Sequence, residues 1–269
     1  MRKEISEYFN SVGIEYFTIL SYDSCIETNK RIIDREGFLP ASIIIYLLPY
    51  YSGETVNLSR YAASLDYHIA IKEINSGLCE LLLKHFPTSR LRGYGDHSPI
   101  NERHAALIGG LGISGDNGLI INEKYGSYVF IGDVITDIDP LKLGASVPIE
   151  PKRCEGCGIC KASCPTGILC GEGKDCLSAI TQRKGDLTDE EKDLMRKYNI
   201  LWGCDECQRY CPHNLNAVKT PIEFFYKDRI PCLTEELLDS MSDEDFEKRA
   251  FAWRKRKTIE RNLDILANK

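Results

Sequence analysis

Residues 154–165 read Cys154-Glu-Gly-Cys157-Gly-Ile-Cys160-Lys-Ala-Ser-Cys164-Pro165, and this stretch decides how the chain is organised. The spacing is C-x₂-C-x₂-C-x₃-C-P, in which three closely spaced thiolates surround one iron–sulfur cluster. The fourth cysteine ligates a second cluster, and the proline after it leads the backbone out of the helix. A second run has the same ending and reads Cys204-Asp-Glu-Cys207-Gln-Arg-Tyr-Cys211-Pro212.

Two other uses of cysteine fit this pattern poorly. A zinc ribbon needs four ligands in two pairs, whereas the first run is a triplet followed by Cys-Pro. Disulfides are not expected, because the amino terminus, Met1-Arg-Lys-Glu-Ile, lacks the apolar segment of a secretory signal. The sequence therefore predicts two four-iron clusters in a domain of the bacterial ferredoxin type.

The reciprocal pattern predicts which cysteines share a cluster. The first cluster takes the triplet of the first run and the last cysteine of the second run, namely Cys154, Cys157, Cys160 and Cys211. The second cluster takes the remaining motif cysteines, Cys164, Cys204 and Cys207. One ligand of the second cluster is then missing, and spacing leaves both Cys170 and Cys176 as candidates. Cys25, Cys79 and Cys232 have no partner at ligand spacing, and we interpret them as small buried apolar residues.

Length and composition limit the possible classes of protein. At 269 residues, of which 43% are hydrophobic, the chain is long enough for one large domain and a smaller one. No apolar stretch approaches the ~20 residues of a membrane span, so we expect no membrane contact and a cytoplasmic location. The net charge of −6 argues against a surface devoted to nucleic acid. The exception is Arg254-Lys255-Arg256-Lys257, either a solvated helix face or a phosphate-binding patch.

Helix and strand patterns alternate irregularly before the cysteine runs. Helices are expected over 2–12, 66–86 and 101–109, and strands over 14–20, 42–48, 118–122 and 128–136. Without a regular βαβ repeat, the predicted fold class is α+β. We expect a first, catalytic domain over residues 1–140, a double-cluster domain over 141–222 and a helical tail over 223–269, with one helix over 234–241 and another from Ser242 onward.

One glycine-rich segment matches a nucleotide-binding motif in the wrong context. Gly110-Leu-Gly112-Ile-Ser-Gly115 fits G-x-G-x-x-G, which binds a dinucleotide only when it follows a strand and opens a helix. Here a helix is expected before the segment and a strand after it. We therefore interpret these residues as turn glycines, with close approach to another ligand as the alternative.

The 153 residues before Cys154 exceed what a ferredoxin of about 60 residues needs, which indicates a second function. Three segments there read Ser59-Arg60-Tyr61-Ala-Ala-Ser-Leu-Asp66-Tyr67-His68, Asp96-His-Ser-Pro99-Ile-Asn-Glu102-Arg103, and Gly110-Leu-Gly112 through Gly126-Ser127-Tyr-Val-Phe130-Ile-Gly132. In order and spacing the chain resembles epoxyqueuosine reductase, the cobalamin and iron–sulfur enzyme that completes queuosine in tRNA. Cys176-Leu-Ser resembles the family's isolated second-cluster cysteine, and this favours Cys176 over Cys170.

The resemblance implies a nitroreductase-like α+β domain that binds cobalamin. The implied cofactor-binding residues are Arg60, Asp66, Tyr67, His68, Arg103, Gly112 and Asn117. Asp66-Tyr-His68 also approaches the corrinoid motif D-x-H-x-x-G, but Ile71 replaces the glycine. We therefore interpret His68 as a hydrogen-bonding residue at a helix start, with cobalt ligation as the alternative.

The chain departs from the family at four places. Ser64-Leu65 replaces Gly-Arg, His97 replaces a small hydroxyl residue, and Ile113-Ser-Gly115-Asp116 replaces Trp-x-Gly-Lys. The sequence also stops at Lys269, short of the helical repeat domain that many members use on tRNA. We expect the cofactor machinery to be retained, and any binding of a tRNA anticodon stem-loop to be weak.

The resemblance also implies a catalytic acid. Reductive opening of a carbon–oxygen bond releases a basic alkoxide, which a positioned acid must protonate. Asp96 matches the family's proposed proton donor, and a capping aspartate before the helix at Asn101 is the alternative. The two clusters would pass single electrons from a low-potential donor, a ferredoxin or a flavodoxin.

Two classes of function follow from these residues. The first is a cobalamin-dependent reductase that acts on epoxyqueuosine or on an unknown small molecule. The second is a ferredoxin-type electron-transfer protein whose amino-terminal domain docks a partner.

Overall fold

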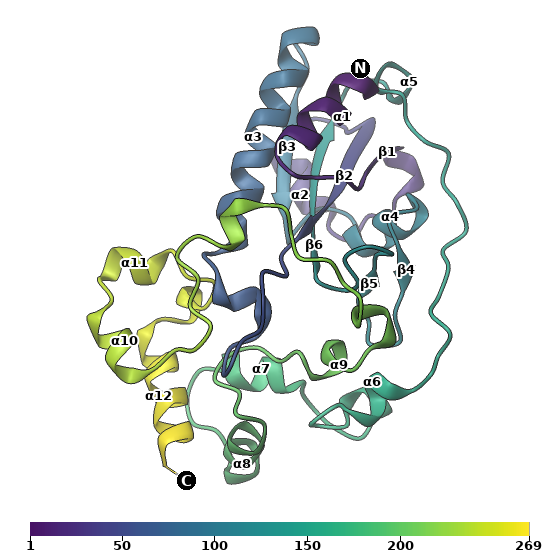
Figure 1. The fold of residues 1–269 in the computed structure, drawn as a ribbon. Coiled ribbons are helices and arrows are strands. Elements are labelled where there is room, and N and C mark those ends of the chain that lie inside the picture. The colour runs from purple at the N-terminus through teal and green to yellow at the C-terminus, as the bar shows by residue number, and fades with distance from the viewer. Residues whose placement is uncertain (269) are drawn as a thin grey trace. The chain divides into compact units, whose positions relative to one another are not determined.

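The computed structural model describes residues 1–268, which form two units (Figure 1). The first unit contains residues 1–49 and 68–155, and the second contains residues 50–67 and the chain from Gly156 onward. The sequence had suggested boundaries near 140 and 222. In the structure, residues 50–67 and the carboxy-terminal tail both belong to the same unit as the second cysteine run.

An antiparallel four-stranded sheet forms the centre of the first unit, in the order β1-β2-β6-β3. The strands are β1 (Phe17–Ser21), β2 (Ser42–Pro49), β3 (Leu91–Gly95) and β6 (Val129–Thr136). Every residue of β2 is buried, because strands flank it on both edges and helices cover both faces. The short strands β4 (Ile113–Ser114) and β5 (Ile120–Ile121) pair separately.

Helices cover the two faces of this sheet according to the alternation of side chains along β2. On one face, α1 (Arg2–Ser11) and α3 (Tyr67–His85) pack against Tyr46, whose hydroxyl donates to Asn75 Oδ1 over 3.0 Å. On the other face, Ile43 and Ile45 share a core with α2 (Lys30–Glu36) and α4 (Glu102–Ile108). A short helix, α5 (Pro140–Leu143), follows β6. The predicted α+β class is confirmed.

The second unit is built from short helices. They are α6 (Ile159–Ala162), α7 (Leu177–Gln182), α8 (Asp189–Tyr198), α9 (Glu206–Arg209), α10 (Glu235–Ser240), α11 (Asp243–Glu247) and α12 (Arg256–Ala267). Trp202 and Phe251 are fully buried, with ring centroids 6.3 Å apart. Asn262 of α12 donates from Nδ2 to the carbonyls of Thr181 and Leu201, both over 2.8 Å. The tail therefore completes the core of the unit that carries the second cysteine run.

Several predicted elements need adjustment. The helix expected from Ser242 begins at its predicted cap, but it ends at Glu247, and a left-handed Lys255 (φ 71°) precedes the separate helix α12. Strand β3 and helix α2 were not expected. Within residues 1–268, no helix has both the length and the apolar composition needed to cross a membrane.

The central position of β2 predicts the effect of truncating its side chains. Ile44→Ala should lower the free energy of unfolding by about 2–5 kcal/mol, because the fully buried side chain leaves a cavity. Urea denaturation followed by circular dichroism measures this loss. Leu39→Ala is the control and should change stability by less than about 0.5 kcal/mol, because Leu39 is 84% exposed. Equal effects of the two changes would contradict the assigned core.

Candidate functional site

The second cysteine run is fixed by a buried carboxylate. Asp205, between Cys204 and the helix α9, accepts hydrogen bonds from Ser59 Oγ and from the backbone N–H of Arg60, each over 2.6 Å. Gly203, just before the run, has a left-handed backbone (φ 75°), and its N–H donates to Thr181 Oγ1 over 3.0 Å. These contacts hold the loop in one conformation before any metal is considered.

Five thiols of the second unit lie close enough to influence at least one of the others. Burial raises the pKa of the Cys207 thiol to about 12, and the neighbouring Cys176, Asp205, Cys164 and Cys160 add to the rise. Burial also raises the pKa of Cys204 well above its ordinary value, and Cys176 again contributes. Iron would reverse this effect, because a coordinating metal ion stabilises thiolates outright.

Cys164 lies in a loop whose backbone amides favour its thiolate. Burial acts to raise the pKa of this thiol, but the N–H groups of Leu169, Thr166 and Ile168, with the Thr166 hydroxyl, together hold it below its ordinary value. The left-handed Gly167 (φ 68°) lies within this turn. An arrangement of converging N–H groups is typical of the loops that hold iron–sulfur clusters. The residues present therefore fit such a cluster.

The two candidates for the open ligand position differ in their surroundings. Cys176, at the start of α7, acts electrostatically on both Cys204 and Cys207. Both cysteines are exposed, and Sγ of Cys170 lies 3.7 Å from the carbonyl oxygen of Lys161. Of the two candidates, Cys176 is thus the one that interacts with Cys204 and Cys207, although Cys160, predicted for the other cluster, also acts on Cys207.

The ligands predicted for the other cluster are divided between the two units. Cys160 on α6 and Cys211 after α9 are buried in the second unit, whereas Cys157 is exposed there. Ser163, which follows α6, donates from Oγ to the carbonyl of Glu206 and so ties the two cysteine runs together. Cys154 belongs to the first unit, where its N–H donates to Ser114 O over 2.9 Å. In residues 1–268, no three Cys, His, Asp or Glu side chains are grouped closely enough for a single metal ion.

In the first unit, Asp96 lies in a turn directly after β3. Its side chain is 55% exposed, and Oδ2 lies 3.6 Å from Nε2 of His68, near the start of α3. Asp96 and His97 both have left-handed backbones, with φ of 59° and 54°. The cap of α4 is Asn101, whose Oδ1 accepts from the His104 N–H. The helix cap, which was the alternative role for Asp96, is therefore Asn101.

The other predicted cofactor residues have varied environments. In the second unit, the buried Arg60 lies 2.6 Å from Glu54 Oε2, and the backbone N–H of Asp66 donates to Lys248 O. Tyr67, also in this unit, and His68 open α3. In the first unit, Arg103 donates to the carbonyl of Gly118.

Of the predicted cofactor residues in the first unit, Asn117 offers the clearest sign of a ligand, whereas Gly112 is explained by packing. Nδ2 of Asn117 is buried and donates to no acceptor among the described residues, although buried amides are normally hydrogen-bonded. This donor suits a ligand rich in carbonyl groups, such as a corrin with its carboxamide side chains. A side chain at Gly112 would place Cβ 2.5 Å from the carbonyl oxygen of Ile121, so packing alone requires this glycine. As predicted, a helix, α4, precedes this glycine segment and a strand, β5, follows it, although the short strand β4 lies within the segment.

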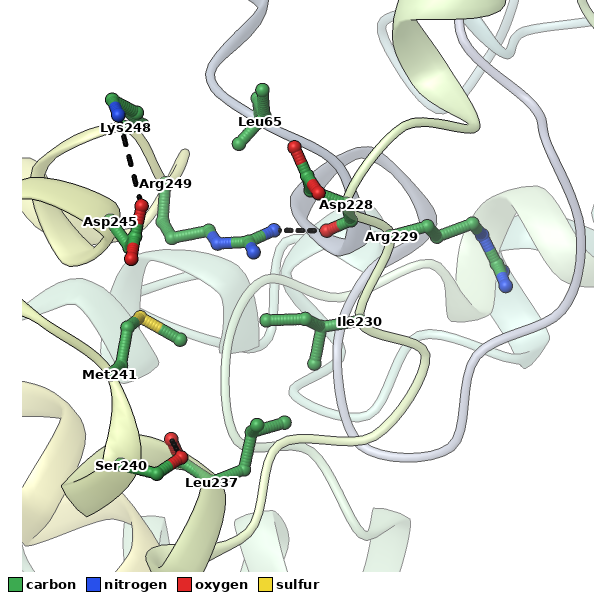
Figure 2. A pocket seen from close by; sticks show the side chains of 10 residues that line it. All are labelled: Leu65, Asp228, Arg229, Ile230, Leu237, Ser240, Met241, Asp245, Lys248 and Arg249. Carbon is green, nitrogen blue, oxygen red and sulfur yellow. Dashed lines mark hydrogen bonds and ion pairs between the residues drawn. The ribbon is translucent and has the colours of Figure 1, made fainter.

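A cavity of about 450 Å³ lies in the second unit, away from the two cysteine runs in sequence. Figure 2 shows its lining, in which Arg249 donates to the backbone carbonyl of Asp228 and Lys248 faces Asp245 at 3.7 Å. Arg249 is 7% exposed, and burial lowers its pKa. Leu65, one of the departures from the family pattern, also lines this cavity. Arg249 thus bridges the loop before Ile230 and the end of α11.

Two carboxyl groups near Asp96, one partly buried and one fully buried, were missed from the sequence. They are Glu102, at the start of α4, and Asp133, in the middle of β6. Burial raises the pKa of Glu102 to about 7, with a further contribution from Asp96. The signal in the sequence was an acidic residue at an inward position of an otherwise apolar strand, Val129–Thr136.

Comparison with known proteins agrees with both halves of this description. Residues 153–214 match the family model of a 4Fe-4S double cluster binding domain. The fold and the cysteine pattern therefore define an α+β iron–sulfur oxidoreductase.

Similarity to particular proteins extends over nearly the whole chain. The epoxyqueuosine reductase of Listeria monocytogenes is 31% identical over 99% of this chain and 80% of its own length. That of Escherichia coli is 35% identical over 71% of this chain and 50% of its own. The chain belongs to the epoxyqueuosine reductase family, which is cobalamin-dependent.

Solved structures of this family have the same fold. A selenomethionine-labelled epoxyqueuosine reductase superposes with a TM-score of 0.78 at 28% identity, covering 98% of this chain and 80% of that one. An epoxyqueuosine reductase with an epoxyqueuosine-modified tRNA stem loop gives 0.76 at 27% identity, with the same coverage.

The thiol arrangement predicts which cysteine completes the second cluster. Protein reconstituted without oxygen should bind about eight irons, as two four-iron clusters require. Cys176→Ala should reduce the count to about four, because Cys176 adjoins Cys204 and Cys207. Cys170→Ala is the matched control and should keep both clusters. Iron and sulfide analysis with paramagnetic resonance measures this, and loss of a cluster in Cys170→Ala alone would overturn the assignment.

Proposed function

We propose that this chain reduces epoxyqueuosine to queuosine in tRNA. The observation that carries the proposal is the similarity to the Listeria epoxyqueuosine reductase over 99% of this chain, which includes the cysteine runs and the Asp96 turn together. An electron-transfer protein would need only the cysteine runs. The reducing conditions that open thiols require fit a cytoplasmic location.

In this proposal the cysteines hold two four-iron clusters. The first cluster is held by Cys154, Cys157, Cys160 and Cys211, and the second by Cys164, Cys176, Cys204 and Cys207. Single electrons from a ferredoxin or flavodoxin would enter through them. Bound cobalamin supplies the strongly reducing centre that the carbon–oxygen bond requires.

The residues of the first unit would bind and protonate. Asn117 offers an unused amide donor to the cofactor, and Arg103 and His68 lie on elements next to the Asp96 turn. Asp96, half exposed, would donate a proton to the oxygen as its carbon–oxygen bond is broken. The complete removal of the epoxide oxygen takes two electrons, which the clusters would deliver singly, and two protons, and the oxygen leaves as water.

The basic cluster near the carboxy terminus is only partly available to RNA. Arg256 donates to the carbonyls of Leu238 and Met241, so its guanidinium is committed to the fold. Lys255 and Lys257 remain exposed, next to Trp253, which is 53% exposed with the Arg254 guanidinium over its ring. With a net charge of −6, these contacts support weak, salt-sensitive binding of a tRNA stem-loop.

The proton-donor role of Asp96 predicts a selective loss of turnover. Asp96→Asn should retain both clusters and cobalamin but lower kcat by about 10²–10⁴-fold, the usual contribution of general acid catalysis. The assay supplies epoxyqueuosine, free or within a stem-loop, with a chemical reductant. Asp23→Asn, an exposed carboxylate elsewhere in the first unit, is the control and should leave kcat unchanged.

Three outcomes separate the candidate functions. No binding of cobalamin at micromolar concentration would favour the electron-transfer protein. Binding of cobalamin without reduction of either substrate would transfer the function to another small molecule, a result that fits the changes at Leu65, His97 and Asp116. Full turnover in Asp96→Asn would support the assignment as a reductase but would show that Asp96 is not its proton donor.

The affinity for the stem-loop should fall as the salt concentration rises, with a slope set by a small number of phosphate contacts. Lys257→Ala should reduce the slope of log affinity against log salt by about 1, as removal of one phosphate contact does. Lys142→Ala, an exposed lysine in the first unit, should leave the slope unchanged. Fluorescence anisotropy of a labelled stem-loop at several salt concentrations measures both, and equal slopes in all three proteins would exclude the cluster.

A further inference from the structure

Two carboxyl groups that the proposed function does not use lie behind the Asp96 turn. Asp133 on β6 is fully buried, paired in register with Ile45 on one side and Tyr94 on the other. Glu102, in the first turn of α4, lies within hydrogen-bonding reach of Asp133. The two groups are 31 residues apart in the chain and meet only through the packing of α4 on the sheet.

One oxygen of each group is left without a donor. Oε1 of Glu102 and Oδ2 of Asp133 are both buried, and no described residue donates a hydrogen bond to either. Two ionised carboxylates offer only acceptors, so they would repel each other here. A single proton between them gives one group a donor and removes half of the buried charge.

Among the described residues, no positively charged group interacts with the pair. Burial raises the pKa of Asp133 well above its ordinary value, and Glu102 adds to the rise. The other titratable groups that interact with the pair come from the segment after β1, from β2 and β3, and from the following turn. They are acidic or neutral at pH 7, namely Tyr22, Cys25, Tyr46, Tyr94 and Asp96.

The pair is also attached to both ends of the Asp96 turn. The backbone N–H of Asp96 lies close enough to Glu102 to favour the ionised form of its carboxyl group, and Ser98 Oγ donates to Asp133 Oδ1 over 3.2 Å. Between these two anchors, Asp96 and His97 hold left-handed backbones. Two successive non-glycine residues keep such a conformation only where their surroundings fix it.

We propose that Glu102 and Asp133 share one proton at neutral pH and act as positioning residues that hold the Asp96 turn from behind. The shared proton is a property of the first unit alone. The positioning of a catalytic acid rests on the proposed function, since it gives Asp96 that role.

The shared proton has a definite effect on stability. Consider a carboxyl group whose pKa is higher in the folded protein than in the unfolded protein. Below its pKa in the unfolded protein, the group does not reduce stability. Stability is lost as the pH rises from that pKa through the pKa in the folded protein. For Glu102, these two values are 4.5 and about 7. The pair should therefore cost the protein stability as pH rises over this range.

Thermal unfolding at several pH values tests the shared proton. In Asp133→Asn, the amide supplies the missing donor at every pH, so its Tm should rise relative to the wild type between about pH 5 and pH 8. Glu102→Gln should show the same trend and serves if the first variant folds poorly. A Tm difference that is the same at both ends of this range, or that favours the wild type at high pH, would overturn the shared proton.

Hydrogen exchange tests the positioning without requiring any activity. Glu102→Gln keeps an oxygen that accepts from the Asp96 N–H, whereas Glu102→Ala removes it. The amides of residues 96–98 should exchange at least tenfold faster in Glu102→Ala, and near the wild-type rate in Glu102→Gln. Equal exchange in the two variants would overturn the positioning role. If the protein does not reduce epoxyqueuosine, both measurements still stand, and only the catalytic meaning of the turn is lost.

Discussion

The buried carboxylate of Asp205 is the interaction on which the second unit depends. It is 5% exposed and accepts hydrogen bonds from Ser59, from the backbone of Arg60 and from Gln208 Nε2. A buried charge without such partners costs several kcal/mol, so these donors are needed for the loop to fold. They also explain why residues 50–67 group with a cysteine run about 140 positions later.

Burial raises the pKa of acidic groups at two places in this chain, and a different positive charge stabilises the buried groups at each place. Around Cys204 and Cys207, burial disfavours the thiolates until iron provides a positive charge. The fold there is completed by a metal, as in other proteins whose ligands repel each other in its absence. Around Glu102 and Asp133, none of the described residues that interact with the pair is a cation, and a proton is the smallest charge that relieves the repulsion. The side chain of Asp96, by contrast, is half exposed.

Much of the first unit could be predicted because its elements have clear local patterns. The apolar run of β2 and the helical spacing of α3 stand out in the sequence. Strand β3 was missed because Leu91-Arg-Gly-Tyr-Gly95 contains two glycines and an arginine, and it is a strand only through its pairing with β6. The cluster ligands could be predicted from the spacing of the cysteines, because ligation of a cluster requires that spacing. The pair of Glu102 and Asp133 could not, because it arises from tertiary packing between segments without a shared local pattern.

The grouping of residues 50–67 with the second unit has a consequence for the order of biosynthesis. As the chain emerges from the ribosome, this segment appears before most of the first unit, yet Trp202 and Asp205 are made some 140 residues later. At typical elongation rates of about 5–20 residues per second, Leu58 and Arg60 wait roughly 7–30 seconds for the groups that bury them. The residues of the first unit are complete once residue 155 has been made. Iron–sulfur assembly at the second cysteine run, in contrast, requires the chain to have been made as far as Cys211.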